Sequence, residues 1–407
     1  MDKVNSRCAG LDIHKDSVFA AVRVDGRQTI AKFGTNTREL LRLADWLAEQ
    51  GVTIVAMEST GVFWKPVWNL LEDRFEVMLV NAQHIKQVPG RKTDVKDCAW
   101  IAQLLEHGLL KASFVPDRPQ RELRDLTRQR TQLLGDRARV INRIQKTLED
   151  ANIKLASLAT KIMGKSGRAI LDALVEGKLS PAQMAELVHH RMNAKKPALR
   201  EALAGRMGDH HRFMLEQLLG QFDELTRRIE SFDTRVVAVM SPLELEAVKR
   251  MDAIDRNDKR TAQKVIAEIG TDMKRFATPQ HLASWAGICP GNNQSAGKRK
   301  SGRTRKANNW LKEALTQAAW GASRTRRSYF RAQHARLADR RGTKRAIVAV
   351  AHSLLVTVHC LLSRPAEYSD LGADYFARKQ ESAQTQAQKM VEKLKRLGYH
   401  VDLKPAA

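Results

Sequence analysis

Cysteine is scarce in this chain of 407 residues, which contains only four, Cys8, Cys98, Cys289 and Cys360. These residues lie far apart in the sequence and form no Cys-x-x-Cys spacing. The pattern therefore indicates neither a disulfide framework nor a zinc ribbon. We expect isolated thiols in a reducing cytosol.

Long apolar runs are also missing. The longest, from Ile347 to Leu362, is interrupted by His352, Ser353 and His359, and it falls short of the about 20 consecutive apolar residues that span a bilayer. We expect it to form a buried helix. Residues 1–5 contain no apolar signal-peptide core, so the sequence predicts no membrane partner.

Acidic residues are few relative to basic ones. The chain has 70 Lys and Arg against 45 Asp and Glu, a net charge of +25. Its 43% apolar and 28% charged residues are typical of a globular protein, and its length allows two or three domains. A surface this basic attracts polyanions, of which nucleic acids and anionic membranes are the commonest.

The positive charge is concentrated near the C-terminus. Residues 291–345 carry 16 basic and 2 acidic side chains, whereas residues 1–120 carry 16 basic and 15 acidic ones. Two tryptophans, a tyrosine and a phenylalanine are interleaved in the basic segment. We interpret it as a nucleic-acid contact surface, with the aromatic rings stacking on bases or packing in the core, which is the favoured role for the tryptophans. The alternative is a solvated cationic face.

The first third of the chain predicts a mixed sheet covered by helices. Asp25-Gly26 is typical of a tight hairpin turn between two strands. Apolar periodicity predicts strands at 8–13, 18–24, 28–33, 52–57 and 77–80, and helices from 36 or 37 to 47 and near 62–73. This order favours an α/β fold with helices on the faces of the sheet.

Four carboxylates stand out against this scaffold. Asp12 interrupts an apolar strand, Glu58 ends another, and Asp94 and Asp97 open a helix with a spacing that places both on one face. Such hard oxygen ligands suit Mg²⁺, with Mn²⁺ as a substitute, and two ions can assist an in-line attack at phosphorus. Each residue alone also has a structural interpretation: Asp94 follows Thr93 at a helix start, and Glu58 precedes a helix that it can cap.

A second interpretation uses the same first strand. Residues 11–17 are similar to the first phosphate loop of actin-like sugar and acetate kinases. Such loops need small residues so that the backbone approaches the phosphate closely. Here His14 and Lys15 occupy the turn, which, together with the net charge, argues against a kinase.

The middle of the chain predicts long helices. Residues 120–150 carry an apolar stripe, and in residues 215–239 apolar side chains recur at alternating spacings of three and four. This pattern indicates a coiled coil or an antiparallel helix pair, which favours at least a dimer. An amphipathic helix on a globular core is the alternative. Residues 151–210 are expected to form shorter helices and loops.

A serine lies in a basic segment of the C-terminal third. Helices are expected at 261–270 and near 279–286, followed by a loop in which Pro290, Gly291 and Gly297 break regular structure around Ser295. A serine oxygen that attacks phosphorus forms a phosphoserine and divides strand exchange into two transesterifications. Ser301 is a competing candidate. The basic residues expected to hold the phosphodiester are Lys298, Arg299, Lys300, Arg303, Arg305 and Lys306.

These motifs resemble one family when they are taken together. They are Gly10-Leu11-Asp12-Ile13-His14-Lys15, Met57-Glu58-Ser59-Thr60-Gly61, Lys92-Thr93-Asp94-Val95-Lys96-Asp97, and Gly287-Ile288-Cys289-Pro290 followed by Ser295-Ala296-Gly297. The chain resembles the DEDD insertion-sequence transposases of the insertion-sequence one-ten family, also called bridge-RNA-guided recombinases, over most of residues 1–362.

The resemblance implies a domain order. It suggests a RuvC-like, RNase H-fold domain at 1–118, a helical coiled-coil region at 119–240 and a mainly helical C-terminal serine transposase domain at 241–362. A basic tail follows at 363–407, with a helix expected at 388–397 and no assigned function.

The resemblance also implies roles for residues and partners. Asp12, Glu58, Asp94 and Asp97 match the metal ligands, and Ser295 matches the nucleophile. DNA ends and target DNA would be the substrates, paired by a guide RNA that the element encodes. A homo-oligomer, dimeric or a synaptic tetramer, would form composite sites from domains of different subunits, in the bacterial cytoplasm and associated with the nucleoid.

Two other functions remain open. A metal-dependent nuclease that resolves branched DNA, similar to a Holliday-junction resolvase, needs only the four carboxylates. A scaffold that binds RNA or DNA without catalysis needs only the positive charge.

Overall fold

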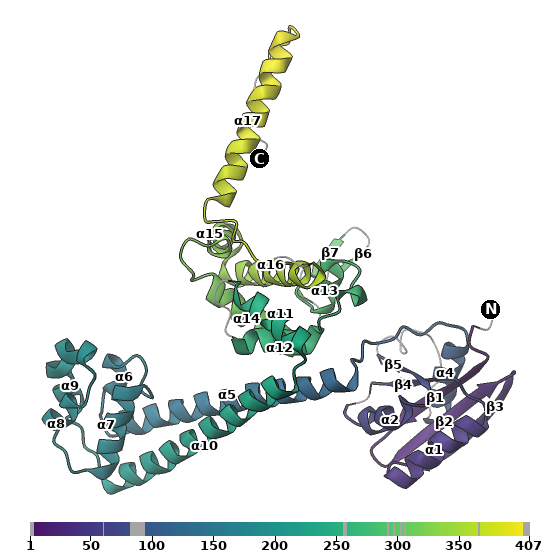
Figure 1. Ribbon diagram of the computed structural model, residues 1–407, viewed down its shortest axis with the longest axis horizontal. Coiled ribbons are helices and arrows are strands. Elements are labelled where there is room, and N and C mark those ends of the chain that lie inside the picture. The colour runs from purple at the N-terminus through teal and green to yellow at the C-terminus, as the bar shows by residue number, and fades with distance from the viewer. Residues whose placement is uncertain are drawn as a thin grey trace. The chain divides into compact units, whose positions relative to one another are not determined.

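The chain forms two compact units, residues 1–117 and 118–407, and each is described by itself (Figure 1). The predicted division into four domains stays a prediction. The computed structural model describes residues 4–59, 61–81, 94–254, 259–290, 293–295, 298–301, 303–304, 307–364 and 367–401. Within these ranges the side chains of residues 94–96, 293–295, 298–301, 380–384 and 386 are not described.

The first unit is a mixed α/β domain, as the sequence predicts. Its strands are β1 (Arg7–Ile13), β2 (Ser17–Val24), β3 (Arg27–Gly34), β4 (Ile54–Glu58) and β5 (Glu76–Val80). Its described helices are α1 (Thr37–Glu49), α2 (Trp64–Leu71) and α4 (Asp94–Glu106).

The five strands form one sheet in the order β3-β2-β1-β4-β5. β1, β2 and β3 pair antiparallel, whereas β4 and β5 continue the sheet in parallel with β1. Asp25 and Gly26 both have positive φ, 49° and 86°, between the paired residues Val24 and Arg27. This conformation matches the right-handed strand twist and confirms the predicted hairpin turn.

The two faces of the sheet carry different cores. Alternate β1 residues such as Ala9 and Leu11 pack with α1 and α2. The other β1 residues face α4, where Cys8 packs with Ala56 of β4 and Ile101 of α4. Asp12 belongs to this second face by the same alternation.

The second unit is helical apart from one small hairpin, within the described residues. Its longer helices are α5 (Arg118–Asp150), α7 (Lys165–Glu176), α10 (Asp209–Val239), α11 (Pro242–Asp252), α12 (Lys259–Ile269), α14 (Asn309–Ala322), α15 (Tyr329–Arg341), α16 (Thr343–Ser363) and α17 (Tyr375–Arg396). Its shorter helices are α6 (Leu155–Leu158), α8 (Pro181–Glu186), η1 (His190–Lys195), α9 (Lys196–Ala202), η2 (Met273–Arg275) and α13 (Pro279–Trp285).

The two longest helices, α5 and α10, lie side by side and run antiparallel (Figure 1). Their direction follows from hydrogen bonds that join Arg130 to Asp233, Arg137 to Thr226 and Asp150 to His211, because one residue number rises as the other falls. The predicted apolar stripe lines this contact, with residues such as Leu225 and Ile229 buried. The structure thus forms the antiparallel helix pair, one of the arrangements that the spacing predicts.

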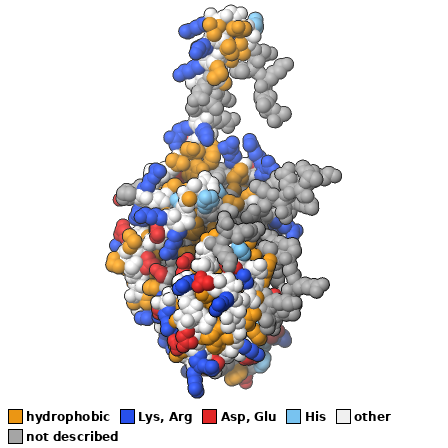
Figure 2. Space-filling view, turned by 90° about the vertical axis from the view of Figure 1, so that its right-hand side faces the viewer, with side chains coloured by type: hydrophobic (Ala, Val, Ile, Leu, Met, Phe, Trp, Pro, Cys, Tyr) orange, Lys and Arg blue, Asp and Glu red, His pale blue; other side chains and the backbone are white. Residues whose placement is uncertain are grey.

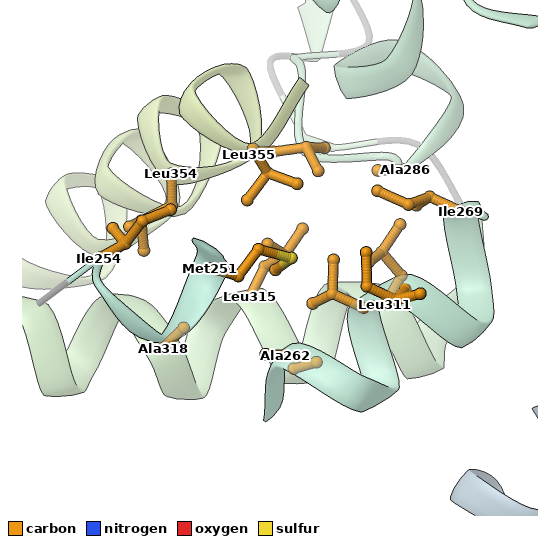
Figure 3. Packing of buried hydrophobic residues seen from close by; sticks show 14 of the residues in the cluster. Met251, Ile254, Ala262, Ile269, Ala286, Leu311, Leu315, Ala318, Leu354 and Leu355 are labelled. Atoms are coloured by element: carbon orange, nitrogen blue, oxygen red, sulfur yellow. The ribbon is translucent and has the colours of Figure 1, made fainter. Parts of the chain in front are cut away.

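The largest core of the second unit gathers around α12 and α16 (Figure 3). Leu354 and Leu355 of α16 face Met251 of α11 and Leu311 and Leu315 of α14. α16 has the length and apolarity of a membrane-spanning helix, but nine of its residues are buried in the protein. It is therefore the buried core helix that the sequence predicts.

The last helix, α17, extends the predicted tail helix toward its N-terminus. Hydrophobic side chains are exposed near its end, next to lysine and arginine side chains (Figure 2). Near its start, Phe376 stacks on Tyr329 of α15, with ring centroids 5.3 Å apart. This aromatic contact anchors α17 to α15.

Candidate functional site

Asp12 and Glu58 lie at the carboxyl ends of two adjacent parallel strands. β1 and β4 are in register from Cys8 opposite Ile54 to Leu11 opposite Met57, so Asp12 and Glu58 are the next positions in that register. Side chains at matching positions point to the same face. Both carboxylates therefore belong to the face that α4 covers.

α4 approaches this face more closely than a side chain would allow. A Cβ atom on Gly10 would lie 2.3 Å from the backbone nitrogen of Ala102 and 2.4 Å from the backbone oxygen of Cys98. Glycine is thus the residue that lets the α4 backbone rest on β1. Asp12 lies two residues after Gly10 on the strand, and Asp97 precedes Cys98 on the helix.

The pKa of the Cys98 thiol depends on the charged groups at this contact. Burial, with smaller contributions from the negative charges of Asp12 and Asp97, raises the pKa of Cys98 to about 11. Both carboxylates therefore act on one buried sulfur atom, although they come from segments far apart in the sequence. Asp12 is 8% exposed and Asp97 is partly buried.

Asp12 has a neighbour that the sequence interpretation assigned to another role. The Nε2 atom of His14 lies 3.1 Å from a carboxylate oxygen of Asp12. The imidazole also meets the edge of the Phe19 ring, with centroids 6.2 Å apart. His14, which counted against a kinase loop, contacts the candidate ligand instead.

The described part of the chain does not complete a metal site. No three Asp, Glu, His or Cys side chains that the structure describes lie close enough together to bind one ion. The side chain of Asp94 is outside the described residues, although α4 begins at this position. Three of the predicted ligands thus come from the end of β1, the end of β4 and the first turns of α4, and the four-ligand site stays a prediction.

Ser295 lies in a two-stranded hairpin. Strand β6 (Asn293–Ser295) pairs antiparallel with β7 (Lys298–Ser301), with Ser295 opposite Lys298 and Asn293 opposite Ser301. The expectation of a segment without regular structure around Ser295 was therefore wrong. Two residues separate the strands, which is the commonest length of a hairpin connection, and the interpretation took Gly297 for a strand breaker.

Most residues of the predicted phosphate-holding set have no described side chain. The side chains of Ser295, Ser301, Lys298, Arg299 and Lys300 are outside the described ones, as are Arg305 and Lys306. Arg303 is described and is exposed. The predicted roles of this set therefore stay predictions.

Beyond the hairpin, sequence reasoning missed a cationic cavity formed by α15, α16 and the segments that flank the hairpin. Its basic residues Arg341, Lys344 and Arg345 were counted in the charged segment but not assigned to a site. The missed signal was their position around Gly342, which has φ 79° and separates α15 from α16.

Comparisons with known proteins agree with the motifs. A family model described as a transposase (DEDD type, IS110) matches residues 9–153, and a second model, described as transposase IS116/IS110/IS902 family, matches residues 248–335. The first match includes all four candidate carboxylates, and the second includes Ser295 and the cationic cavity up to residue 335. No curated protein sequence matches the chain at a significant level.

Proposed function

Because this chain belongs to the IS110 family of DEDD transposases, we propose that it excises and inserts a mobile DNA element with a carboxylate site and a serine nucleophile. The observation that carries the proposal is the close contact of α4 with β1 at Gly10. Because of this contact, the negative charges of Asp12 on β1 and Asp97 on α4 both raise the pKa of the buried Cys98 thiol. The RuvC-like, RNase H-type fold implied by the family is compatible with the five-stranded mixed sheet.

The carboxylates are the part of the site that would hold metal. Asp12, Glu58, Asp94 and Asp97 would supply hard oxygen ligands to Mg²⁺ or Mn²⁺. When bound, the ion would neutralise charge on the reacting phosphate. Two carboxylates, Asp12 and Glu58, at the ends of adjacent strands on one face favour a cation or a proton near them, which supports a metal-binding role. His14 would orient the Asp12 carboxylate through its contact at 3.1 Å.

The serine would supply the covalent step. The Ser295 oxygen attacks phosphorus and forms a new P–O bond, one P–O bond to a deoxyribose oxygen breaks, and the serine proton leaves to a base. The released sugar oxygen takes up a proton. Attack by a sugar hydroxyl on the phosphoserine reverses these steps and joins a new pair of ends. The basic residues that follow Ser295 would hold the phosphodiester, and an element-encoded RNA would choose the DNA.

The test is a denaturant-stable protein–DNA adduct. The purified protein is incubated with labelled element-end DNA, its co-purified RNA and Mg²⁺, and the products are separated under denaturing conditions. Ser295→Ala should lose both the adduct and excision, whereas Ser301→Ala, the same change in the same hairpin, should keep both. Cleavage that persists in Ser295→Ala without an adduct would instead support the branched-DNA nuclease.

The carboxylates need a separate comparison. Asp12→Asn should abolish the adduct while DNA binding persists, because the change removes charge without removing volume. Asp16→Asn is the matched control, since Asp16 is exposed and lies in the loop after β1. Full activity of Asp12→Asn and Asp94→Asn would favour a scaffold without catalysis. Light scattering on the complex with DNA and RNA tests the proposed dimer or tetramer.

A further inference from the structure

A cavity of about 1030 Å³ lies in the second unit at the base of the β6–β7 hairpin. Pro290 and Thr304, which flank the hairpin in sequence, pair through an isolated β-bridge and both line the cavity. Its other walls come from α15 and the first half of α16. One cavity thus joins the hairpin that bears Ser295 to α15 and α16, which contribute Arg341, Lys344 and Arg345 to its lining.

Among the residues that the structure describes, the cavity is lined by cations and by no carboxylate. Arg303, Arg341, Lys344 and Arg345 belong to its lining. Lys344 and Arg345 lie in the first turn of α16, where the helix dipole disfavours positive charge. Among the described residues, Arg341, Lys344 and Arg345 make no ion pair. This placement does not stabilise the helix, and it fits the binding of an anion.

Apolar and polar side chains share the rest of the lining. Val348 and Ala349 supply apolar surface. Gln333 donates a hydrogen bond to the Ser353 hydroxyl at 2.7 Å, and its Oε1 atom is buried with no hydrogen-bond partner among the described residues. Burial lowers the pKa of His352, another lining residue, which favours the neutral imidazole, a group that can both donate and accept a hydrogen bond.

We propose that this cavity binds one unstacked nucleotide, with its phosphate among Arg341, Lys344 and Arg345 and its base against Val348, Ala349, Gln333 and Ser353. Apolar surface with a few polar groups is typical of a small-molecule site, and the volume is near the upper end for such sites. A base within a duplex presents only its groove edges, so the occupant must leave the stack, as in other proteins that take up single bases.

The identification of the ligand as a nucleic acid rests on the proposed function. The position of the cavity places the bound nucleotide near the proposed reaction. Ser295 is five positions after Pro290, so their Cα atoms are at most about 18 Å apart. At about 3.4 Å per nucleotide along one strand, the bound nucleotide lies within about five positions of the phosphate that Ser295 attacks. The cavity would hold that strand in register while its backbone is exchanged.

The experiment measures binding of the full-length protein to fluorescent hairpin duplexes by anisotropy. One duplex is fully paired and the other carries a single unpaired nucleotide, and both are made as DNA and as RNA. We expect the duplex with the unpaired nucleotide to bind roughly tenfold more tightly in at least one of the two nucleic acids. The nucleic acid with the larger preference identifies the source of the nucleotide.

Two sets of variants locate the preference. Lys344→Gln with Arg345→Gln should reduce it to about twofold or less, whereas Arg326→Gln with Arg327→Gln, an equal loss of exposed charge outside the cavity lining, should weaken both duplexes alike. Ala349→Trp should remove the preference by filling the cavity. If this variant does not fold, Gln333→Ala is the alternative test, because a smaller side chain cannot overfill the cavity. Gln333→Ala should reduce the preference.

The proposal is overturned if the unpaired nucleotide gives no advantage in DNA or RNA, or if the cavity variants keep the full preference. These binding measurements require no strand cleavage. They therefore give a result even if Ser295→Ala remains active and the proposed chemistry fails.

Discussion

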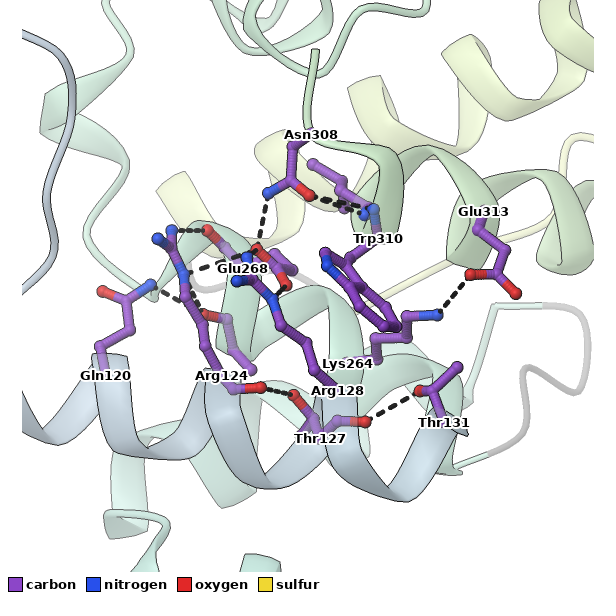
Figure 4. Close-up of polar contacts among 12 residues, drawn as sticks. Gln120, Arg124, Thr127, Arg128, Thr131, Lys264, Glu268, Asn308, Trp310 and Glu313 are labelled. Atoms are coloured by element: carbon purple, nitrogen blue, oxygen red, sulfur yellow. Dashed lines mark hydrogen bonds and ion pairs between the residues drawn. The ribbon is translucent and has the colours of Figure 1, made fainter. Parts of the chain in front are cut away.

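Arg128 of α5 donates two parallel hydrogen bonds to the carboxylate of Glu268 of α12, at 2.8 and 2.9 Å (Figure 4). The Glu268 side chain is fully buried, and Asn308 donates a third hydrogen bond to it at 2.6 Å. Arg124 lies 3.5 Å from the same carboxylate. These contacts fix the long helix α5 to the C-terminal core that carries the hairpin.

We expect Arg128→Met to destabilise the second unit by about 3 kcal/mol, because the buried Glu268 carboxylate loses two hydrogen bonds and a neighbouring positive charge. Urea unfolding followed by circular dichroism measures this loss. Arg139→Met is the matched control on the same helix. Arg139 is 67% exposed and pairs with Asp136 on the surface of the same helix, so its removal should change the free energy of unfolding by less than about 1 kcal/mol. Equal losses would show that Glu268 does not depend on Arg128.

A second prediction concerns the contact of α4 with β1. Gly10→Ala places a methyl group 2.3 Å from the backbone of Ala102, so α4 must move. We expect a loss of about 1–3 kcal/mol from overpacking and a loss of excision activity, because α4 carries Asp94 and Asp97. Thermal unfolding and an excision assay measure the two effects.

The control for Gly10 is the same substitution where space is free. A Cβ atom on Gly220, inside α10, would meet nothing within 4 Å. Gly220→Ala should therefore stabilise the protein by about 1 kcal/mol through helix propensity and leave excision intact. A stable and fully active Gly10→Ala protein would contradict the proposed importance of the α4 position.

The sequence predicted the elements of the first unit well because each carries a local signal. Strand alternation, the Asp25-Gly26 turn and the apolar stripe of α1 all depend on neighbours in sequence. The contact between α4 and β1 does not. Gly10 signals a close approach, but the identity of the approaching helix depends on packing between segments about 90 residues apart.

The long helices were predictable from the sequence, whereas the hairpin was not. Apolar spacing predicted α5 and α10 as a pair, and their antiparallel direction was one of the arrangements left open. Around Ser295, the glycine and proline residues led us to predict a loop. The strands there were missed because strands of three and four residues carry little periodic signal. The cavity was not predictable, because α15 and α16 contribute to it only after folding.

A third prediction concerns the anchor of α17. Phe376 stacks on Tyr329, and Arg336 lies 5.0 Å from the centre of the Phe376 ring. Phe376→Ala should remove about 1 kcal/mol of ring contact, so amide hydrogen exchange in the first turn of α17 should accelerate several-fold. Tyr399→Ala changes an aromatic residue that is 64% exposed and should leave this exchange unchanged. If both variants behave alike, the stacking does not hold the helix.

A fourth prediction uses the acid stability of the helix pair. Burial acts to raise the pKa of Asp233, but the hydrogen bond and charge of Arg260, together with the charge of Arg130, outweigh it and lower the pKa below its ordinary value. The lowered pKa means that the ion pairs stabilise the folded protein above the unfolded pKa of about 3.9. This contribution is lost as the pH falls through the folded-state pKa.

Asp233→Asn should therefore lower the free energy of unfolding at pH 6, and its difference from the unsubstituted protein should shrink below about pH 3.9. The variant removes the carboxylate that accepts a hydrogen bond from the guanidinium of Arg130, which is 2% exposed, so the loss at pH 6 should be about 3 kcal/mol. Asp252→Asn, at an exposed position of α11, is the control and should change stability little at either pH. A difference for Asp233→Asn that stays constant from pH 6 to pH 2.5 would mean that this carboxylate does not contribute through its charge.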